Sequence, residues 1–352
     1  MNKTIYNMCL LALGILFTSC EHKELCYEHP HSTEVQIIFD WSYAPYAEKQ
    51  NLVEGMCLWF YPVDEDGNQT GKPLRFDLAG MKGGTIEIPN GRYQVLYYNN
   101  DYEIVEFRGT DEFWQQECYT REGHIFEPIY GNTVNYAPRA NGTESERVVV
   151  TPDMMWGDHA MNVEIRPQGL SYWFVRDGET ERTTIERDDH RFTLMPHEQI
   201  CNYTYEIRNV KNLDGVTQMS ASLSGMSGSV FCAAEQVRRE YVTVPFNAAA
   251  GSSTTIDGQF NTFGHYDRNA DINRDGKAGE TEVPHKLVLY VWLNDGSKYY
   301  YTFDVTDQVD LAPDKRHVHI VVEDLDLPKP ITGGDMEVAV DDWIVVNEDI
   351  EM

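Results

Sequence analysis

One segment of the sequence spaces oxygen-bearing side chains as a site for a hard cation requires. Asp, Asn and Asp stand at its first, third and fifth positions, Gly at the sixth and Glu at the twelfth, which is the pattern of a calcium-binding loop. The seventh position of such a loop contributes a backbone carbonyl, and the final carboxylate binds through both oxygens. The candidate calcium ligands are Asp271, Asn273, Asp275, Lys277 and Glu282.

The flanks of this loop do not favour the helices that usually enclose such a site. Pro284 follows the last ligand, a strand is expected from His285, and residues 263–265 upstream are not helical in pattern. A calcium loop between two strands and an exposed acidic loop without an ion both fit this sequence. No motif requires a cofactor, so calcium is the one ion that the sequence suggests.

Two further groups of residues resemble catalytic or metal-binding arrangements without completing them. Residues 225–229 read Gly-Met-Ser-Gly-Ser, but Ser229 stands where the nucleophile elbow of esterases requires a second glycine. His317 and His319 share one face of a strand expected at residues 316–322, without a third ligand in view. We therefore expect no catalytic residues and no enzymatic activity.

The N-terminus carries the features of an export signal. One lysine precedes an apolar run from Met8 to Phe17, and Thr18 and Ser19 precede Cys20. The run is shorter than the roughly 20 residues that span a bilayer. The arrangement resembles the bacterial lipobox, in which the cysteine thiol is lipidated and signal residues 1–19 are removed. We expect lipid attachment at Cys20, palmitate included, and a tether over residues 20–33; an ordinary secretory signal with an incidental cysteine is the alternative.

Composition limits the classes of partner. The 352 residues carry a formal net charge of −29 and a pI near 4.6, which argues against binding to nucleic acid or anionic lipid head groups. No Cys-x-x-Cys pair exists, so the sequence supports neither a zinc knuckle nor a redox dithiol. One or two disulfides remain open, but we expect mostly buried thiols among Cys26, Cys57, Cys118, Cys201 and Cys232.

Short runs of apolar and aromatic residues, several of them alternating, indicate the strands that would position these groups. The runs include residues 34–42, 56–63, 74–78, 85–88, 148–150, 154–165, 204–210 and 316–322. The Asn90-Gly91 turn precedes a strand in which Tyr93, Val95 and Tyr97 share one face, and the stretch resembles a strand of transthyretin-like modules. Residues 285–293 and 298–305 form the best hairpin. Residues 111–118 could form a short helix.

These patterns predict an all-β fold with two transthyretin-like (Greek-key) β-sandwich domains in tandem after the signal peptide. The N-terminal domain is expected over residues 34–166 and the C-terminal domain over residues 167–330, with the boundary near Arg166-Pro167. A C-terminal strand or tail follows over residues 331–352. Its alternating residues are Met336, Val338, Val340, Trp343 and Val345.

The backbone N–H and C=O groups of this tail can form hydrogen bonds in two ways. It can pair within its own domain, or it can act as a donor strand that pairs with the sheet edge of another subunit. The sequence leaves both open.

Several motifs spread along the chain resemble one family of proteins. They are Cys20-x-His22-Lys23-Glu24-Leu25-Cys26-Tyr27-x-His29-x-His31, Phe39-Asp40-Trp41, Ala137-Pro138-Arg139-Ala140 with Gly142-Thr143-Glu144, Asp153-Met154-Met155-Trp156-x-Asp158-His159, Tyr203–Asn209, Tyr299–Asp307, Val318-His319-Ile320 and Asp341-Asp342-Trp343. The chain resembles an uncharacterised Bacteroidales-type lipoprotein family related to the fimbrillin and minor fimbrial anchor proteins.

The resemblance implies a function one step removed, since that family has no established activity of its own. In the related fimbrial proteins, lipoproteins with two β-sandwiches assemble by strand complementation, and anchor subunits keep their lipid. No convincing cleavage site separates the first two expected strands here, since Lys49 lies in a loop-like segment and Arg75 comes later. We therefore expect an anchor or accessory subunit of a fimbria-like adhesive assembly in the outer membrane, with fimbrial subunits as partners. An outer-surface glycan-binding lipoprotein is the alternative.

Overall fold

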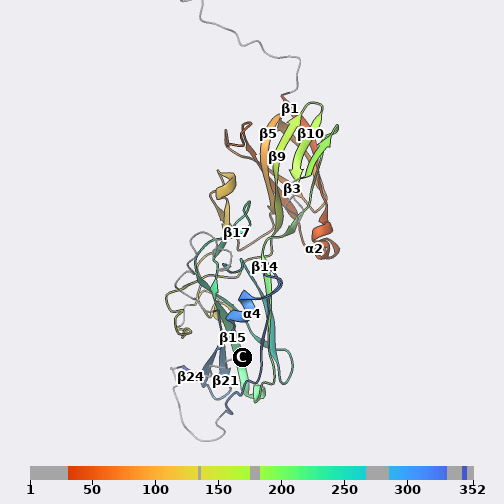
Figure 1. Ribbon diagram of the computed structural model, residues 1–352. Helices are drawn as coiled ribbons and strands as arrows, with labels where there is room; N and C mark the ends of the chain where they lie inside the picture. Colours follow the sequence, from red (N-terminus) through yellow and green to blue (C-terminus); the bar gives the residue numbers. More distant parts are fainter. Residues whose placement is uncertain (1–30, 134–135, 175–182, 267–284, 331–342, 347–352) are drawn as a thin grey trace, which may run out of the picture.

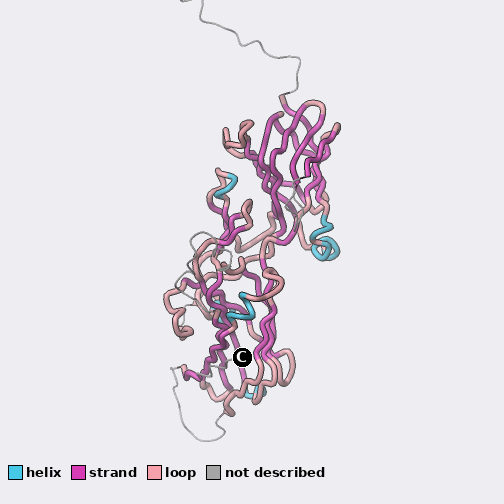
Figure 2. The backbone as a smooth tube through the Cα atoms, viewed as in Figure 1, coloured by secondary structure: helices cyan, strands magenta, loops and turns pink. Residues whose placement is uncertain are grey.

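The computed structural model describes residues 31–133, 136–174, 183–266, 285–330 and 343–346. Strands dominate these residues, and the all-β class is confirmed (Figures 1 and 2). The helical turns are short: η1 (Trp41–Tyr43), α2 (Pro45–Gln50), η2 (Phe113–Gln115), α3 (Glu127–Tyr130), η3 (Leu213–Gly215) and α4 (Thr306–Asp310). In this part of the chain, no helix has the length and apolar character needed to cross a membrane.

Two sheets pack face to face near the N-terminus, and we call them the N-terminal sheet pair. The smaller sheet has the order β12 (Arg191–Leu194), β1 (Ser32–Phe39), β4 (Gly83–Pro89). The larger has the order β11 (Thr183–Arg187), β10 (Gly169–Phe174), β9 (Trp156–Arg166), β5 (Gly91–Asn99), β2 (Gly55–Pro62), β3 (Leu74–Ala79), and β13 (His197–Glu198) pairs with β9. One hydrophobic core contains side chains from both sheets.

Strand β5 is buried on both faces, which explains its continuous apolar run. Tyr93, Val95 and Tyr97 lie in the core between the two sheets, as the alternation predicted. Leu96 and Tyr98 point to the opposite face, where they join a second hydrophobic cluster. Because neighbouring side chains in a strand alternate between faces, a strand between two cores carries apolar residues on both faces, as β5 does from Val95 to Tyr98.

That second cluster lies where the two halves of the chain meet. A four-stranded sheet, here the junction sheet, has the order β17 (Gln236–Val237), β16 (Ser229–Phe231), β7 (Glu117–Tyr119), β6 (Glu106–Arg108). It therefore combines two strands from each half of the sequence. Buried residues from β2, β5, β7 and β16 pack together here, including Cys57, Tyr98, Cys118 and Val230.

Two more sheets, the C-terminal sheet pair, enclose the largest core. One has the order β19 (Ala249–Ala250), β20 (Ile256–Thr262), β14 (Cys201–Ile207), β23 (His319–Val322). The other has the order β24 (Ile344–Val346), β22 (Lys298–Asp304), β21 (Lys286–Leu293), β15 (Val216–Met226), β18 (Val242–Asn247), β8 (Arg147–Val148). The expected hairpin is present as β21 and β22, and in Figure 1 this pair of sheets lies below the first.

The chain does not pass from one sheet pair to the other at the position that the sequence suggested. Arg166 and Gly169 face each other across the β9–β10 hairpin, so the expected boundary at residues 166–167 falls inside one sheet. The chain completes the N-terminal sheet pair only after β12 and β13, at Glu198. The segment between β5 and β9 also leaves that pair, since β8 adds to β18 of the C-terminal pair. In place of the short helix considered at residues 111–118, the structure has the turn η2 and β7.

Candidate functional site

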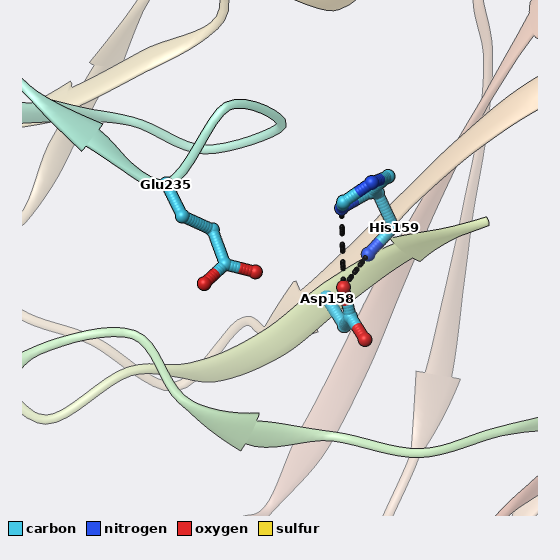
Figure 3. Close-up of side chains that lie close together, drawn as sticks. All are labelled: Asp158, His159 and Glu235. Carbon is cyan, nitrogen blue, oxygen red and sulfur yellow. Dashed lines mark hydrogen bonds and ion pairs between the residues drawn. The ribbon is translucent and has the colours of Figure 1, made fainter. Parts of the chain in front are cut away.

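A compact group of histidine and carboxylate side chains lies between the N-terminal sheet pair and the junction sheet. Asp158 and His159 follow each other on β9, and Glu235 reaches toward them from the turn between β16 and β17 (Figure 3). One potential ligand atom from each residue lies within 4.8 Å of those of the other two. Among the described residues, these three are the group of histidine, cysteine or carboxylate side chains whose ligand atoms come close enough together to hold a metal ion.

Local backbone geometry turns the first two side chains toward one another. Consecutive residues of a strand normally face opposite sides of the sheet. Here the Asp158 carboxylate curls back, and its Oδ1 accepts a hydrogen bond of 2.6 Å from the backbone N–H of His159. The same oxygen lies 3.1 Å from Nδ1 of His159, as the dashed lines in Figure 3 mark.

Glu235 is held from two sides. Its Oε1 lies 3.2 Å from Nε2 of His197, and its Oε2 accepts a hydrogen bond of 2.8 Å from Nη2 of Arg316. The residue adopts a φ of +50°, a left-handed conformation that is uncommon outside glycine and is frequently found at functional sites. Glu235 and Arg316 both line a cavity of about 690 Å³.

His197 completes a ring of four polar side chains. Strand β13 places it opposite Gly157 of β9, and its Nδ1 lies 3.6 Å from Oδ2 of Asp158. Each histidine therefore contacts a carboxylate, and the ring links β9 to the turn before β17.

Charges in this ring favour the ionised forms. Burial works to raise the pKa of Glu235, but the hydrogen bond from His197 and the charges of His197, Arg316 and His159 outweigh it and lower that pKa to about 2. Burial works to lower the pKa of His197, but the Glu235 and Asp158 carboxylates raise it above its ordinary value. The pKa of His159 is raised in the same way, chiefly by Asp158.

Among the described residues, those predicted from the sequence do not belong to this group. Cys20, the calcium-loop ligands Asp271, Asn273, Asp275, Lys277 and Glu282, and the tail residues Met336, Val338 and Val340 lie outside the described residues. The Ser227 hydroxyl donates to the backbone carbonyls of Ser229 and Arg238, which are structural contacts. His317 contacts Asp314 and Glu198, whereas His319 contacts Thr204, so the two histidines do not form one site.

The described part of the tail forms an edge strand of its own chain. Strand β24 pairs in parallel with β22, with Ile344 opposite Tyr299. The Trp343 ring stacks on Phe126 at 5.2 Å between centroids and meets Trp292 edge-on at 4.9 Å. Val345 remains 49% exposed. The described part of the tail is therefore held by its pairing with β22, by Val346 against the core and by the Trp343 ring.

Residues 19–247 match a known protein family, which is described as a domain of unknown function (DUF5119). The chain belongs to the DUF5119 family. The matched part of this DUF5119 protein includes all strands of the N-terminal sheet pair and the junction sheet, and it extends through β18. It thus contains Asp158, His159 and Glu235.

Two relatives have related sequences or folds, and a third structure is more distant. The DUF5119 chain is 31% identical over 121 residues to "Putative fimbrium anchoring subunit Fim4B" of Bacteroides ovatus, over 34% of this chain and 33% of that protein. The match spans about a third of the length of this curated relative. A crystal structure described as a putative adhesin from Bacteroides ovatus has the same fold, with a TM-score of 0.55 and 20% identity over 90% of this chain and 99% of that one. The fimbrial anchor protein Mfa2 from Porphyromonas gingivalis gives a TM-score of 0.41 and 14% identity, over 82% and 90% of the two chains.

Proposed function

We propose that this protein is a cell-surface lipoprotein that acts as an anchor or accessory subunit of a fimbria-like adhesive assembly. Its sequence relationship to a protein named as a fimbrium anchoring subunit supports this role. In this proposal the two sheet pairs are transthyretin-like sandwiches in tandem, and lipid on Cys20 holds the N-terminus to the outer membrane. The role is non-catalytic.

The observation that carries the proposal is the short strand at the outer edge of the C-terminal sheet pair. Strand β24 spans only Ile344–Val346 and has β22 as its one neighbouring strand among the described residues. An edge strand presents a row of backbone N–H and C=O groups that can pair with another chain. Ile344 is 41% exposed and Val345 is 49% exposed, so two apolar side chains are also available for contact.

Strand complementation would use this segment in one of two ways. The tail can leave β22 and complete the sheet of a second subunit, or it can stay in place while its outer edge accepts a partner strand. In both cases main-chain hydrogen bonds provide affinity and alternate side chains provide specificity. The first way exposes β22 and the rings of Tyr290 and Trp292, which Trp343 now contacts.

Deletion of residues 335–352 from the tagged full-length chain tests the proposal. Cells that produce fimbriae would carry either version, and a fimbrial subunit would be detected by immunoblot after mild solubilisation and tag capture. We expect the subunit to be captured with the intact chain and lost with the deletion. Equal capture by the two versions would overturn strand complementation by the tail.

The lipid anchor requires a separate test. A Cys20→Ser variant would be compared with the unchanged chain for incorporation of labelled palmitate and for recovery with outer membranes. We expect both to be lost in the variant, because the thiol is the attachment atom. Since the tail is unchanged in this variant, solubilised Cys20→Ser protein should still capture the fimbrial subunit. Palmitate in the variant would contradict lipidation at Cys20.

An exposed aromatic residue favours glycan binding as a second candidate function. Trp114 is 49% exposed and lines a hollow of about 480 Å³ together with the amide side chains of Asn68, Gln69 and Gln94. An exposed ring beside amide groups suits stacking on a sugar and hydrogen bonding to its hydroxyls. A glycan array with the full chain and a Trp114→Ala variant distinguishes the two functions, because glycan binding predicts a signal that the variant loses and tail deletion leaves unchanged.

A further inference from the structure

We propose that Asp158, His159 and Glu235 form a site for one divalent transition-metal ion of the zinc class, placed between the two halves of the chain. The three ligand atoms already lie within 4.8 Å of one another. Strand β9 supplies two of the ligands, and the turn between β16 and β17 supplies the third. The proposal concerns this site alone and does not depend on the role in a fimbria.

Distances between the side chains fit an ion with short bonds. Zinc binds imidazole nitrogen and carboxylate oxygen at about 2.0–2.2 Å in tetrahedral geometry, which places neighbouring ligand atoms about 3.4 Å apart. Oδ1 of Asp158 and Nδ1 of His159 lie 3.1 Å apart, so this edge of the tetrahedron is nearly formed. One Glu235 carboxylate oxygen lies within 4.8 Å of a ligand atom of each of the other two residues, so a modest approach of Glu235 completes three corners of the tetrahedron.

The nature of the ligands selects the class of ion. Calcium and magnesium prefer cages made of oxygen atoms, whereas imidazole suits zinc and its neighbours among the transition metals. A set of one imidazole and two carboxylates leaves a fourth position, as in open zinc sites. Water can fill that position through the adjoining cavity, or His197 can approach from β13, where it already contacts both carboxylates.

The ring of His159 provides an independent observation that favours a bound ion. Its Nδ1 is buried and has no hydrogen-bond partner among the residues that the structure describes, although Asp158 lies 3.1 Å away. The contact lacks hydrogen-bonding geometry, and a buried nitrogen without a hydrogen bond is unfavourable. A metal ion between the two atoms would satisfy this nitrogen.

Neighbouring groups hold the ligands in position. Arg316 binds Oε2 of Glu235 at 2.8 Å and leaves Oε1 directed at the ring, and the His159 backbone N–H fixes the Asp158 carboxylate. Such contacts from surrounding groups orient the metal-binding side chains in known metal sites. The positive charge of Arg316 opposes a cation, whereas the carboxylates of Asp158 and Glu235 favour one. A bound ion would join β9 to the junction sheet.

Calorimetric titration of the metal-free full chain with Zn²⁺ tests the site. We expect one tight equivalent, and we expect His159→Gln and Glu235→Gln each to weaken it by more than about 10-fold, because loss of outer-shell partners alone costs 10- to 100-fold. The two substitutions lie on different halves of the chain, and circular dichroism checks that each variant folds. Ca²⁺ titration should give the same result in all three proteins.

His317→Gln serves as the matched control. His317 also contacts two carboxylates, but Asp314 lies 2.9 Å from its Nδ1 and Glu198 lies 2.9 Å from its Nε2, so the carboxylates meet opposite nitrogens. They cannot converge on one ion, and this variant should bind Zn²⁺ like the unchanged chain. Co²⁺ in place of Zn²⁺ gives a second readout through the visible absorption of a tetrahedral site. The proposal is overturned if no tight equivalent is found, or if the His159 and Glu235 variants retain it.

Discussion

Arg238 donates two parallel hydrogen bonds to the carboxylate of Glu117, although the two residues lie 121 positions apart in the sequence. Its Nε donates to Oε1 at 2.7 Å, and its Nη2 donates to Oε2 at 2.6 Å. Arg108 makes a second paired contact with the same carboxylate, at 2.7 Å for each bond. The Ser229 hydroxyl also donates to it. Glu117 is therefore the electrostatic centre of the junction sheet, and its side chain is only 2% exposed.

Stability should depend on the ionisation of Glu117. Burial works to raise its pKa, but Arg238, Arg108 and Ser229 outweigh burial and lower the pKa to about 2. Because the folded pKa lies below the unfolded value of about 4.3, this carboxylate stabilises the fold above pH 4.3 and ceases to do so as the pH falls toward 2. We expect Glu117→Gln to lower the free energy of unfolding by about 2 kcal/mol at pH 6.

Urea unfolding of the two proteins at pH 6 and pH 3 measures this effect. The difference between them should shrink at pH 3, because the carboxylate of the unfolded chain is then protonated. Glu106→Gln is a suitable control, since Glu106 lies on the neighbouring strand but is exposed and accepts a hydrogen bond from Tyr119. A difference that stays constant between the two pH values would contradict the role of ionisation.

Local patterns in the sequence were sufficient to predict most strands but not the connections between halves. The Asn90-Gly91 turn and the shared face of Tyr93, Val95 and Tyr97 are local features. The structure has a bend at Asn90, starts β5 at Gly91, and places the three side chains in one core. Continuous apolar runs such as β5 left the second buried face unrecognised, because alternation disappears when both faces are covered. The sequence patterns did not reveal the hairpin β9–β10 for a similar reason. The domain boundary was therefore expected at Arg166, where this hairpin turns.

The candidate metal site could be predicted only in part. Asp158 and His159 belong to a motif that supported the family resemblance, but adjacency on a strand normally separates two side chains. Glu235 approaches them because β16 pairs with β7. That contact joins residues more than a hundred positions apart, and no spacing rule in a single sequence reports it.

The buried cysteines should resist thiol reagents in the folded protein. Cys57, Cys118, Cys201 and Cys232 are free and buried. Burial raises the pKa of Cys57 to about 12 and that of Cys201 to about 11. Since the thiolate is the reactive form, a pKa near 12 lowers its fraction about 10³-fold relative to an exposed cysteine.

Alkylation followed by peptide mass spectrometry checks this directly. We expect these four peptides to stay unmodified at pH 7.5 under native conditions and to react fully in guanidinium chloride. The same spectra report disulfides, which the sequence left open. Rapid native labelling of Cys57, or a disulfide-linked pair among the four, would contradict the prediction.

Close approach of two strands at Gly157 should make that position intolerant of a side chain. A Cβ atom there would lie 2.3 Å from the carbonyl oxygen of Tyr97 and 2.8 Å from Cβ of Tyr98. Gly157→Ala must therefore push β9 away from β5, and we expect a loss of about 2 kcal/mol in the free energy of unfolding. Gly71→Ala is the control, since its nearest neighbour is the Pro62 side chain at 3.2 Å. A loss of less than 0.5 kcal/mol at Gly157, measured by urea unfolding, would be inconsistent with this packing.

Removal of the Trp343 ring should release the tail from its own sheet. The ring packs against Phe126, Tyr290 and Trp292, whereas the strand that follows has only three residues. We expect Trp343→Ala to weaken docking of β24 by about 1–2 kcal/mol, because aromatic contacts and buried area are both lost. Backbone amides of Val345 and Val346 should then exchange with deuterium about 10-fold faster or more.

Hydrogen–deuterium exchange separates this effect from a general loss of stability. Val345→Ala changes a half-exposed side chain of the same strand and should leave exchange nearly unchanged. Peptides from β15, deep in the core, should exchange equally in all versions. If the tail acts as a donor strand, Trp343→Ala should also increase capture of a fimbrial subunit, since the strand no longer has to leave its own sheet first. Faster exchange together with reduced capture would instead indicate that the partner recognises β24 while it remains docked on β22.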